Sequence, residues 1–296
     1  MAVIVAGVDG SPSAMNAAVW AAREAQRRGD TVRLIYAYVV PAGSYPAFVA
    51  SAPKVREGIE QQAQTALDAA RTEVRQQVPD VEIEAQRVEG QPAHVLAGES
   101  RTARCVVVGS RGLGGFTGML VGSVAVSLSA HARCPVAVVR GKRHDDPPPA
   151  QGPVVVGVDG SEHTETALAY AFDAAAERGV PLQAVHSWND VISVEGPYAY
   201  PFPTDLSELE KAGRTLLEET LAPWRERHPE VEVHEVLEPG RPVRTLLQQA
   251  EGAQLVVVGT RGHGGFTGML LGSTSQAMVI HAPCPVVVTR PEESGA

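Results

Sequence analysis

The sequence is one pattern written twice, at a spacing of 150 residues. The run from Gly109 to Ser123 reads GSRGLGGFTGMLVGS, and it returns from Gly259 to Ser273 as GTRGHGGFTGMLLGS, with three of fifteen positions changed. A repeat this long indicates a duplicated domain, because the units of solenoid proteins are far shorter. The total of 296 residues suits two domains of ordinary size.

A short segment at 141–152, reading GKRHDDPPPAQG, separates the two copies. Three consecutive prolines beside charged residues continue neither a helix nor a sheet, so this segment is a predicted linker. We therefore predict two domains, over residues 1–146 and 147–296.

Each copy alternates short apolar runs with helical segments. In the first copy the predicted strands are 3–8, 32–40, 81–88, 105–109 and 135–140, and the predicted helices are 13–28, 55–78, a short one opening at 92, and 123–132. This alternation predicts an α/β fold. We expect two tandem Rossmann-like domains, each a five-stranded parallel sheet with helices on both faces. Such sheets bind ligands where the winding direction reverses, and here glycine-bearing loops follow the first and fourth strands.

Charge, cysteine spacing and hydropathy argue against several classes of partner and of structural site. A net charge of −9 argues against a general nucleic-acid binder or a binder of anionic membranes. Cys105, Cys134 and Cys284 have no CxxC spacing, which indicates buried thiols rather than disulfides or a zinc site. No basic segment precedes the first apolar run, and no apolar stretch reaches the ~20 residues that span a bilayer. We expect a cytoplasmic protein without nucleic-acid or membrane partners.

The loop after the fourth predicted strand carries glycines at a fixed spacing. Gly109 and Gly112 are followed, after nine intervening residues, by Gly122 and Ser123, and the second copy repeats this spacing. Glycine lets the backbone approach a ligand closely. Gly122 and Ser123 stand where the next helix begins, and the free amides of a helix N-terminus favour phosphate. The pattern predicts a phosphate cradle made mostly of backbone amides.

This spacing, G-2x-G-9x-G-[S/T], resembles the ATP-binding motif of universal stress proteins. The resemblance extends over nearly the whole chain, including DGS at 9–11 and CPV at 134–136. It implies one ATP in each half, with a bound Mg²⁺ left open, and backbone contacts from Ala37 and Ser187 to adenine. The ATP-binding residues that it implies are Gly7, Asp9, Ala37, Gly109, Ser110, Arg111, Gly112, Gly114, Gly115, Gly122, Ser123 and Val124 in the first copy, and Gly157, Asp159, Ser187, Gly259, Thr260, Arg261, Gly262, Gly264, Gly265, Gly272, Ser273 and Thr274 in the second.

Several of these residues have a second interpretation. Asp9 and Asp159 are implied to contact the ribose or a bound metal, and each could instead cap the helix that follows. Arg111 and Arg261 could pair with phosphate oxygens or remain in water. His263, inside the second loop, is the main chemical difference between the two loops.

Neither copy contains a recognisable catalytic motif. The glycine loops hold no lysine, which excludes a Walker A site, and no G-x-G-x-x-G follows the first strand. We assign no catalytic residues and no metal site. The resemblance implies a nucleotide-dependent stress-response or regulatory protein that is not an enzyme. Two alternatives stay open: a slow ATP hydrolase, and an interaction module in which ATP is structural.

The closing runs at 135–140 and 285–290 are short, apolar and last in each predicted sheet. A bare apolar edge strand favours pairing with another strand, and the resemblance implies pairing between domains at these edges. We expect an internal domain pair through these strands, and a homodimer of two chains is left open.

Overall fold

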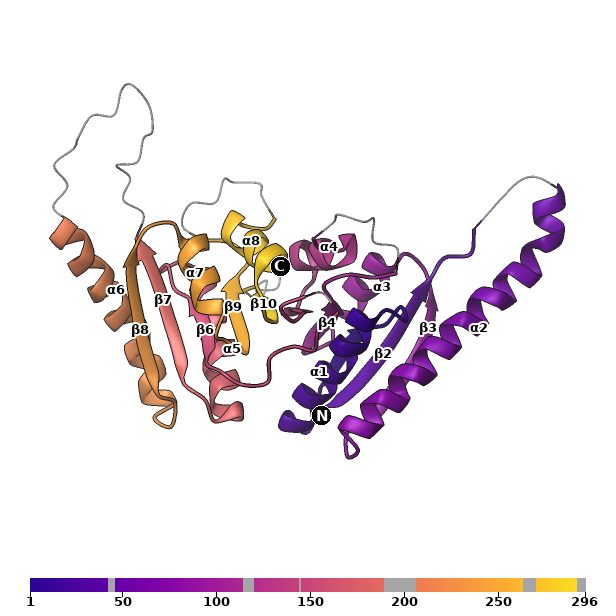
Figure 1. The fold of residues 1–296 in the computed structure, drawn as a ribbon, viewed down its shortest axis with the longest axis horizontal. Coiled ribbons are helices and arrows are strands. Elements are labelled where there is room, and N and C mark those ends of the chain that lie inside the picture. Colours follow the sequence, from indigo (N-terminus) through magenta and orange to yellow (C-terminus); the bar gives the residue numbers. More distant parts are fainter. Residues whose placement is uncertain (42–45, 114–119, 144, 189–205, 263–269, 292–296) are drawn as a thin grey trace, which may run out of the picture. The chain divides into compact units, whose positions relative to one another are not determined.

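The computed structural model divides the chain into two units, Met1–Pro148 and Pro149–Ala296 (Figure 1). The division falls within the predicted linker. The residues that the structure describes are 1–41, 46–113, 120–143, 145–188, 206–262 and 270–291.

The first unit is a parallel sheet of five strands in the order β3-β2-β1-β4-β5. Its elements are β1 (Val3–Gly7), α1 (Pro12–Arg28), β2 (Thr31–Tyr38), α2 (Pro46–Gln77), β3 (Ile83–Glu89), α3 (Pro92–Glu99), β4 (Cys105–Gly109), α4 (Ser123–His131) and β5 (Val136–Val139).

The second unit repeats this arrangement, with strands in the order β8-β7-β6-β9-β10. Its elements are β6 (Val154–Gly157), α5 (Glu162–Arg178), β7 (Leu182–Trp188), α6 (Leu206–Arg227), β8 (Val233–Pro239), α7 (Pro242–Ala250), β9 (Leu255–Gly259), α8 (Ser273–His281) and β10 (Val286–Thr289). The predicted fold class is confirmed in both units. The pairing of the closing strands between the halves stays a prediction.

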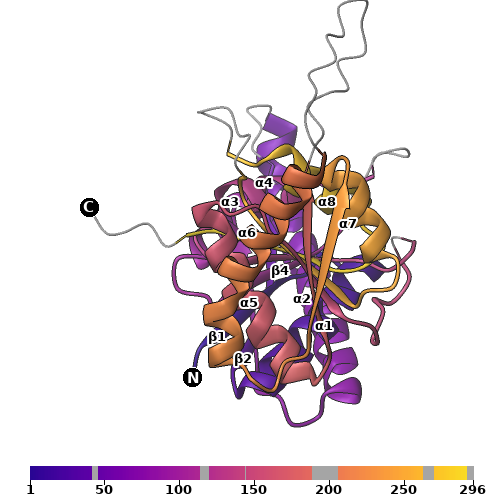
Figure 2. The ribbon, with the colours of Figure 1, turned by 90° about the vertical axis from the view of Figure 1, so that its left-hand side faces the viewer.

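Helices cover both faces of each sheet. In the first unit α1 packs against α2 on one face, and α3 packs against α4 on the other. The second unit matches it, with α5 and α6 to one side of its strands and α7 and α8 to the other (Figure 2). The chain winds outward from β1 to β3 and then crosses to β4, so β1 and β4 are neighbours whose following segments leave toward opposite faces. The divergence of these two segments leaves a crevice at the carboxyl ends of β1 and β4, which is where sheets of this kind bind ligands.

The central strands form because their residues are apolar on both faces. Val5 on β1 and Val106 on β4 are fully buried. Helix α1 begins where Ser11 accepts a hydrogen bond from the amide of Ala14 at 3.1 Å. It ends at Gly29, which adopts the left-handed conformation with φ of 65°. Both ends follow the expected rules for helix caps.

The clearest difference from the sequence prediction concerns α2. The predicted helix began at residue 55, whereas α2 starts at Pro46 and contains Pro53. Proline usually ends a helix because it lacks an amide and crowds the preceding turn, so the pattern placed the helix after Pro53. In this chain the helix continues through it.

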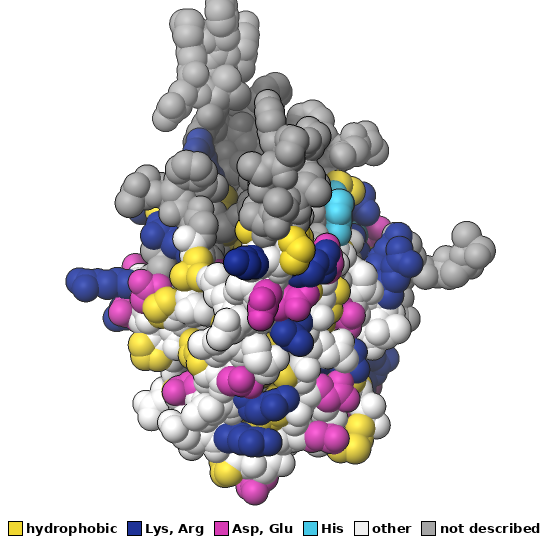
Figure 3. Space-filling view, turned by 90° about the vertical axis from the view of Figure 1, so that its right-hand side faces the viewer, with side chains coloured by type: hydrophobic (Ala, Val, Ile, Leu, Met, Phe, Trp, Pro, Cys, Tyr) yellow, Lys and Arg dark blue, Asp and Glu magenta, His cyan; other side chains and the backbone are white. Residues whose placement is uncertain are grey.

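Charged residues attach α2 to the sheet and cover its outer side. Arg56 binds both carboxylate oxygens of Glu89 on β3, at 2.7 and 3.2 Å. On the side of the first unit that carries α2, acidic and basic side chains are interspersed (Figure 3). Among the residues coloured there, neither sign of charge forms a continuous field. Within the described part of the chain, no helix is long and apolar enough to cross a membrane.

Candidate functional site

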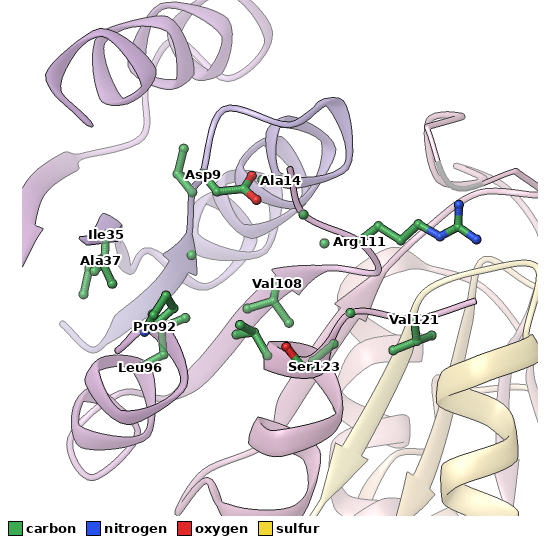
Figure 4. Close-up of a pocket in the computed structure, with 17 residues that line it drawn as sticks. Asp9, Ala14, Ile35, Ala37, Pro92, Leu96, Val108, Arg111, Val121 and Ser123 are labelled. Atoms are coloured by element: carbon green, nitrogen blue, oxygen red, sulfur yellow. The ribbon is translucent and has the colours of Figure 1, made fainter. Parts of the chain in front are cut away.

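The first unit contains a cavity of about 460 Å³ where β1 and β4 end side by side (Figure 4). That volume is in the usual range for small-molecule sites. The ends of β1 and β2, the first turns of α3, the loop after β4 and the start of α4 form its wall. The predicted residues that line it are Gly7, Asp9, Ala37, Gly109, Arg111, Gly112, Gly122, Ser123 and Val124.

Asp9 connects the two loops that border this cavity. One carboxylate oxygen accepts the amide of Ser11 at 2.9 Å, and the other accepts the amide of Leu113 at 2.9 Å. The carboxylate thus fixes the loop after β4 against the loop after β1 (Figure 4). Ser11 caps α1, so the interpretation of Asp9 as the cap is wrong.

Asp159 occupies the equivalent place in the second unit with a denser set of hydrogen bonds. One of its carboxylate oxygens accepts the amide of Ser161 at 3.0 Å, and the hydroxyls of Ser161 and Thr164 at 2.7 Å each. As with Asp9 and Gly112, its second oxygen lies where a side chain on Gly262 would stand. The two units therefore share one arrangement of aspartate and glycine.

Protein contacts alone require several of the loop glycines. A Cβ on Gly109 would lie 2.6 Å from the hydroxyl of Ser13, in the first turn of α1. A Cβ on Gly112 would collide with a carboxylate oxygen of Asp9. The glycine spacing predicts that these residues contact phosphate. In the structure they also let the loop approach α1 and Asp9.

Gly122 is different. Its nearest neighbour for an added Cβ is the carbonyl oxygen of Ser110 at 3.6 Å, an ordinary contact. Its φ of −74° is accessible to any residue. Neither crowding nor backbone conformation requires glycine at this place, which borders the cavity. A ligand that approaches the backbone closely would require it.

The start of α4 presents backbone amides to the cavity. Gly122 is the N-cap, and no side-chain hydrogen bond caps this helix, whereas Ser11 caps α1. Ser123, Val124 and Ala125 line the cavity. The first amides of a helix have no hydrogen-bond partner within the helix itself. Together with the positive end of the helix dipole they can hold an anion. Helix α8 also starts at a glycine, Gly272, without a side-chain cap.

The opposite end of the cavity is apolar. Ile35, Ala37, Pro92 and Leu96 lie on one side, away from Ser123 (Figure 4). Such a surface can pack against a flat, uncharged ring. In the second unit Ser187 replaces Ala37, and its hydroxyl donates to the carbonyl of Gly240 at 2.8 Å, while the amide of Gly240 donates to the end of β7.

Ser110 in the first unit and Thr260 in the second are predicted site residues that are buried beneath the glycine loops. Ser110 is completely buried, and its carbonyl accepts the amide of Gly122 at 2.8 Å. Thr260 is buried too, and its carbonyl accepts the amide of Gly272 at 2.7 Å. Both residues attach the start of a helix to the end of a strand.

The guanidinium of Arg111 extends away from the other labelled side chains of the cavity (Figure 4). Its Nε is buried and has no hydrogen-bond partner among the described residues. Pairing with a phosphate would require this side chain to turn. Four predicted residues, and His263 with them, lie outside the described residues: Gly114, Gly115, Gly264 and Gly265.

The sequence prediction missed the apolar residues of the wall. They are Val8, Ala14, Ile35, Pro92, Leu96, Val108, Val121 and Ala125. Strand alternation could have found Ile35, because residues two apart on a strand share a face and Ala37 was predicted. Tyr36 lies on β2 between Ile35 and Ala37, and burial together with the charge of Asp9 raises its pKa. Among the described residues, no group of three or more His, Cys, Asp or Glu could hold a metal ion.

Residues 1–140 and 152–290 each match the sequence model of the universal stress protein family. A universal stress protein of Mycolicibacterium smegmatis is 41% identical over 298 residues, covering 97% of either chain. One from Mycobacterium tuberculosis is 39% identical over 300 residues, covering 97% of this chain and 94% of its own. The crystal structure of a universal stress protein from Archaeoglobus fulgidus is similar in fold, with a TM-score of 0.71 at 20% identity, covering 97% of this chain and 98% of its own.

Proposed function

We propose that this chain, which belongs to the universal stress protein family, binds one ATP in each unit and acts as a nucleotide-dependent regulatory protein in the response to stress. In this proposal the nucleotide is held rather than turned over, and its presence shifts the population of a partner-binding state.

The observation that carries the proposal is the uncapped start of α4 in the wall of the cavity. Ser123, Val124 and Ala125 are the first three residues of the helix, and all three border the cavity. At the opposite end, Ile35 and Leu96 supply an apolar surface. A cavity with anion-binding amides at one end and apolar walls at the other fits a nucleotide, with phosphates at α4 and the base beside β2.

The second unit supports a stoichiometry of two. The start of α8 is uncapped by side chains, as in α4. Asp159 stands beside Gly262 as Asp9 stands beside Gly112. A duplicated loop that shares the uncapped helix start and the pair of aspartate and glycine is expected to bind the same ligand.

The hydrogen bonds of Asp9 favour binding of ATP over its hydrolysis. Both of its oxygens already accept backbone amides, so its carboxylate orients the loop. Binding alone does not accelerate a reaction, because rate needs groups that stabilise the transition state more than the ground state. Sites that transfer phosphoryl groups commonly use a lysine for this purpose, and neither glycine loop contains one.

The test uses a substitution that retains the fold and fills the anion site. Aspartate is a preferred helix N-cap, so Gly122→Asp should cap α4 with its own carboxylate and exclude phosphate. Gly272→Asp should do the same at α8, where the added Cβ would lie 3.3 Å from the carbonyl oxygen of Thr260, so that Thr260 has to shift slightly. Calorimetry and native mass spectrometry should find two ATP per chain in the wild type, one in each single variant and none in the double variant.

Gly98→Asp is the matched control, because an added Cβ there meets open space and Gly98 does not border the cavity. It adds the same charge and should retain both sites. Unchanged stoichiometry in both single variants, at preserved thermal stability, would contradict the proposed function. So would a wild-type chain that binds no ATP.

A further inference from the structure

The two units differ in the residue that packs behind the glycine loop, which is the loop after β4 in the first unit and after β9 in the second. In the first unit this residue is Ser13, whose hydroxyl accepts the amide of Arg111 at 3.4 Å. In the second unit His163 stands at the equivalent place. Both lie in the first turn of a helix and pack against the glycine that ends the neighbouring strand. A Cβ on Gly259 would lie 2.8 Å from the Cβ of His163.

His163 contacts the residue that attaches α8 to the sheet. It is only 6% exposed, and its Nδ1 lies 3.4 Å from the hydroxyl of Thr260. The carbonyl of Thr260 accepts the amide of Gly272, the N-cap of α8. A change at the imidazole therefore reaches, through one residue, the helix terminus proposed to hold phosphate.

Charged groups from four segments act on this imidazole. Burial and Arg261, from the loop after β9, lower the pKa of His163 below its ordinary value of 6.5. Glu162, 3.7 Å from Nε2, and Asp159, from the turn after β6, act in the opposite direction, and Arg290, beyond β10, lowers the pKa further. The free site thus holds a neutral imidazole at neutral pH. Ser13 cannot titrate in this range.

We propose that His163 is a positioning residue that links nucleotide binding in the second unit to the uptake of a proton, a link that the first unit lacks. This inference rests on the proposed function. An anionic triphosphate at the loop after β9 favours the charged imidazole, and linkage makes the effect reciprocal. Binding therefore raises the pKa of His163.

ATP affinity at the second site should therefore rise as the pH falls. The bound state has the higher pKa, so the gain in affinity is complete below the pKa of the free site. It is lost as pH rises through the pKa of the bound site. Because the pKa of free His163 lies below 6.5, the gain is complete only below pH 6.5. A rise of one pKa unit gives about tenfold in affinity.

The experiment measures each site separately in the full-length chain. Gly122→Asp leaves the second site, and Gly272→Asp leaves the first. ATP affinity is measured by calorimetry from about pH 5.5 to 8. The ratio of the two affinities cancels the titration of ATP itself. We expect the second site to gain about threefold to tenfold over the first as the pH falls.

The histidine is then replaced by a residue that cannot become charged. His163→Asn retains a polar group within reach of Thr260. The readout is the slope of ATP affinity against pH, and the absolute affinity of the variant does not enter it. The relative acidic gain should vanish. His263→Leu, which copies the first loop, should preserve it.

The proton uptake at the second site in excess of that at the first, measured in buffers of different ionisation enthalpy, should disappear with His163→Asn. Parallel profiles at the two sites would overturn this inference and leave the proposed function standing. A slope that survives His163→Asn and disappears with His263→Leu would overturn it too. Failure of both sites to bind ATP at any pH would instead refute the proposed function, and this inference with it.

Discussion

The structure predicts that Gly112→Ala acts through Asp9 in the absence of any ligand. The new methyl would stand on the Asp9 oxygen that accepts the amide of Leu113. Asp9 is a short side chain, so it can turn away only by giving up that hydrogen bond. A hydrogen bond to a charged group contributes about 1.5–3 kcal/mol, and the exposure of Leu113 favours the lower end of that range.

We therefore expect Gly112→Ala to destabilise the first unit by about 1.5 kcal/mol. For a domain of this size that corresponds to a melting temperature lower by roughly 3–6 °C. Because the loop would no longer be fixed, ATP affinity at the first site should fall at least tenfold, equivalent to about 1.4 kcal/mol. Thermal denaturation measures the first quantity. Calorimetry in the Gly272→Asp background measures the second.

A double-mutant cycle tests the mechanism. In an Asp9→Ala background there is no carboxylate to displace, so adding Gly112→Ala should cost almost nothing further. Gly98→Ala, which places its methyl in open space, controls for the substitution itself. If Gly112→Ala lowers stability equally with and without the Asp9 carboxylate, the reasoning is refuted.

Three further results are expected. Hydrolysis of labelled ATP in single-turnover assays should be far slower than the ~1–100 s⁻¹ of kinases, and a rate near 1 s⁻¹ that Asp9→Ala abolishes would favour the hydrolase alternative. Burial raises the pKa of Cys134 to about 12 and also raises the pKa of Cys105, so both thiols should resist alkylation at pH 8 until the protein is denatured, as mass spectrometry can show. Ser11→Ala removes the cap at Ala14 and should destabilise the first unit by about 1 kcal/mol, and an unchanged melting temperature would count against that role.

The sequence predicted the fold well because its central strands, such as β1, β4 and β5, are marked by uninterrupted apolar runs. The fourth predicted strand matches Cys105–Gly109 at both ends, where polar residues and glycine bound the run. The start of α2 was missed because Pro53 is a local signal that the rest of the helix overrides. Local rules of this kind set boundaries only where tertiary packing agrees with them.

The sequence predicted those parts of the site that lie in or beside the glycine motif. Leu96 could not be found, because an apolar residue on a helix looks the same whether it faces the core or a cavity. Ser110 was predicted from its place in the motif, yet its amide donates to the carbonyl of Val139 at 3.1 Å and its side chain is buried. Which side of a loop faces a ligand depends on the strand beside it, and the sequence alone does not give that direction.

The packing of α1 against Gly109, and of α5 against Gly259, bears on how such chains diverge. Under the proposed function, a descendant that stopped binding nucleotide would still need both glycines, because a larger residue would push a helix off the sheet. No such constraint acts on Gly122 once the ligand is gone, and any residue that caps a helix could replace it. In a lineage of tandem chains, the position before α4 should therefore record the loss of nucleotide binding first, while the rest of the loop remains unchanged.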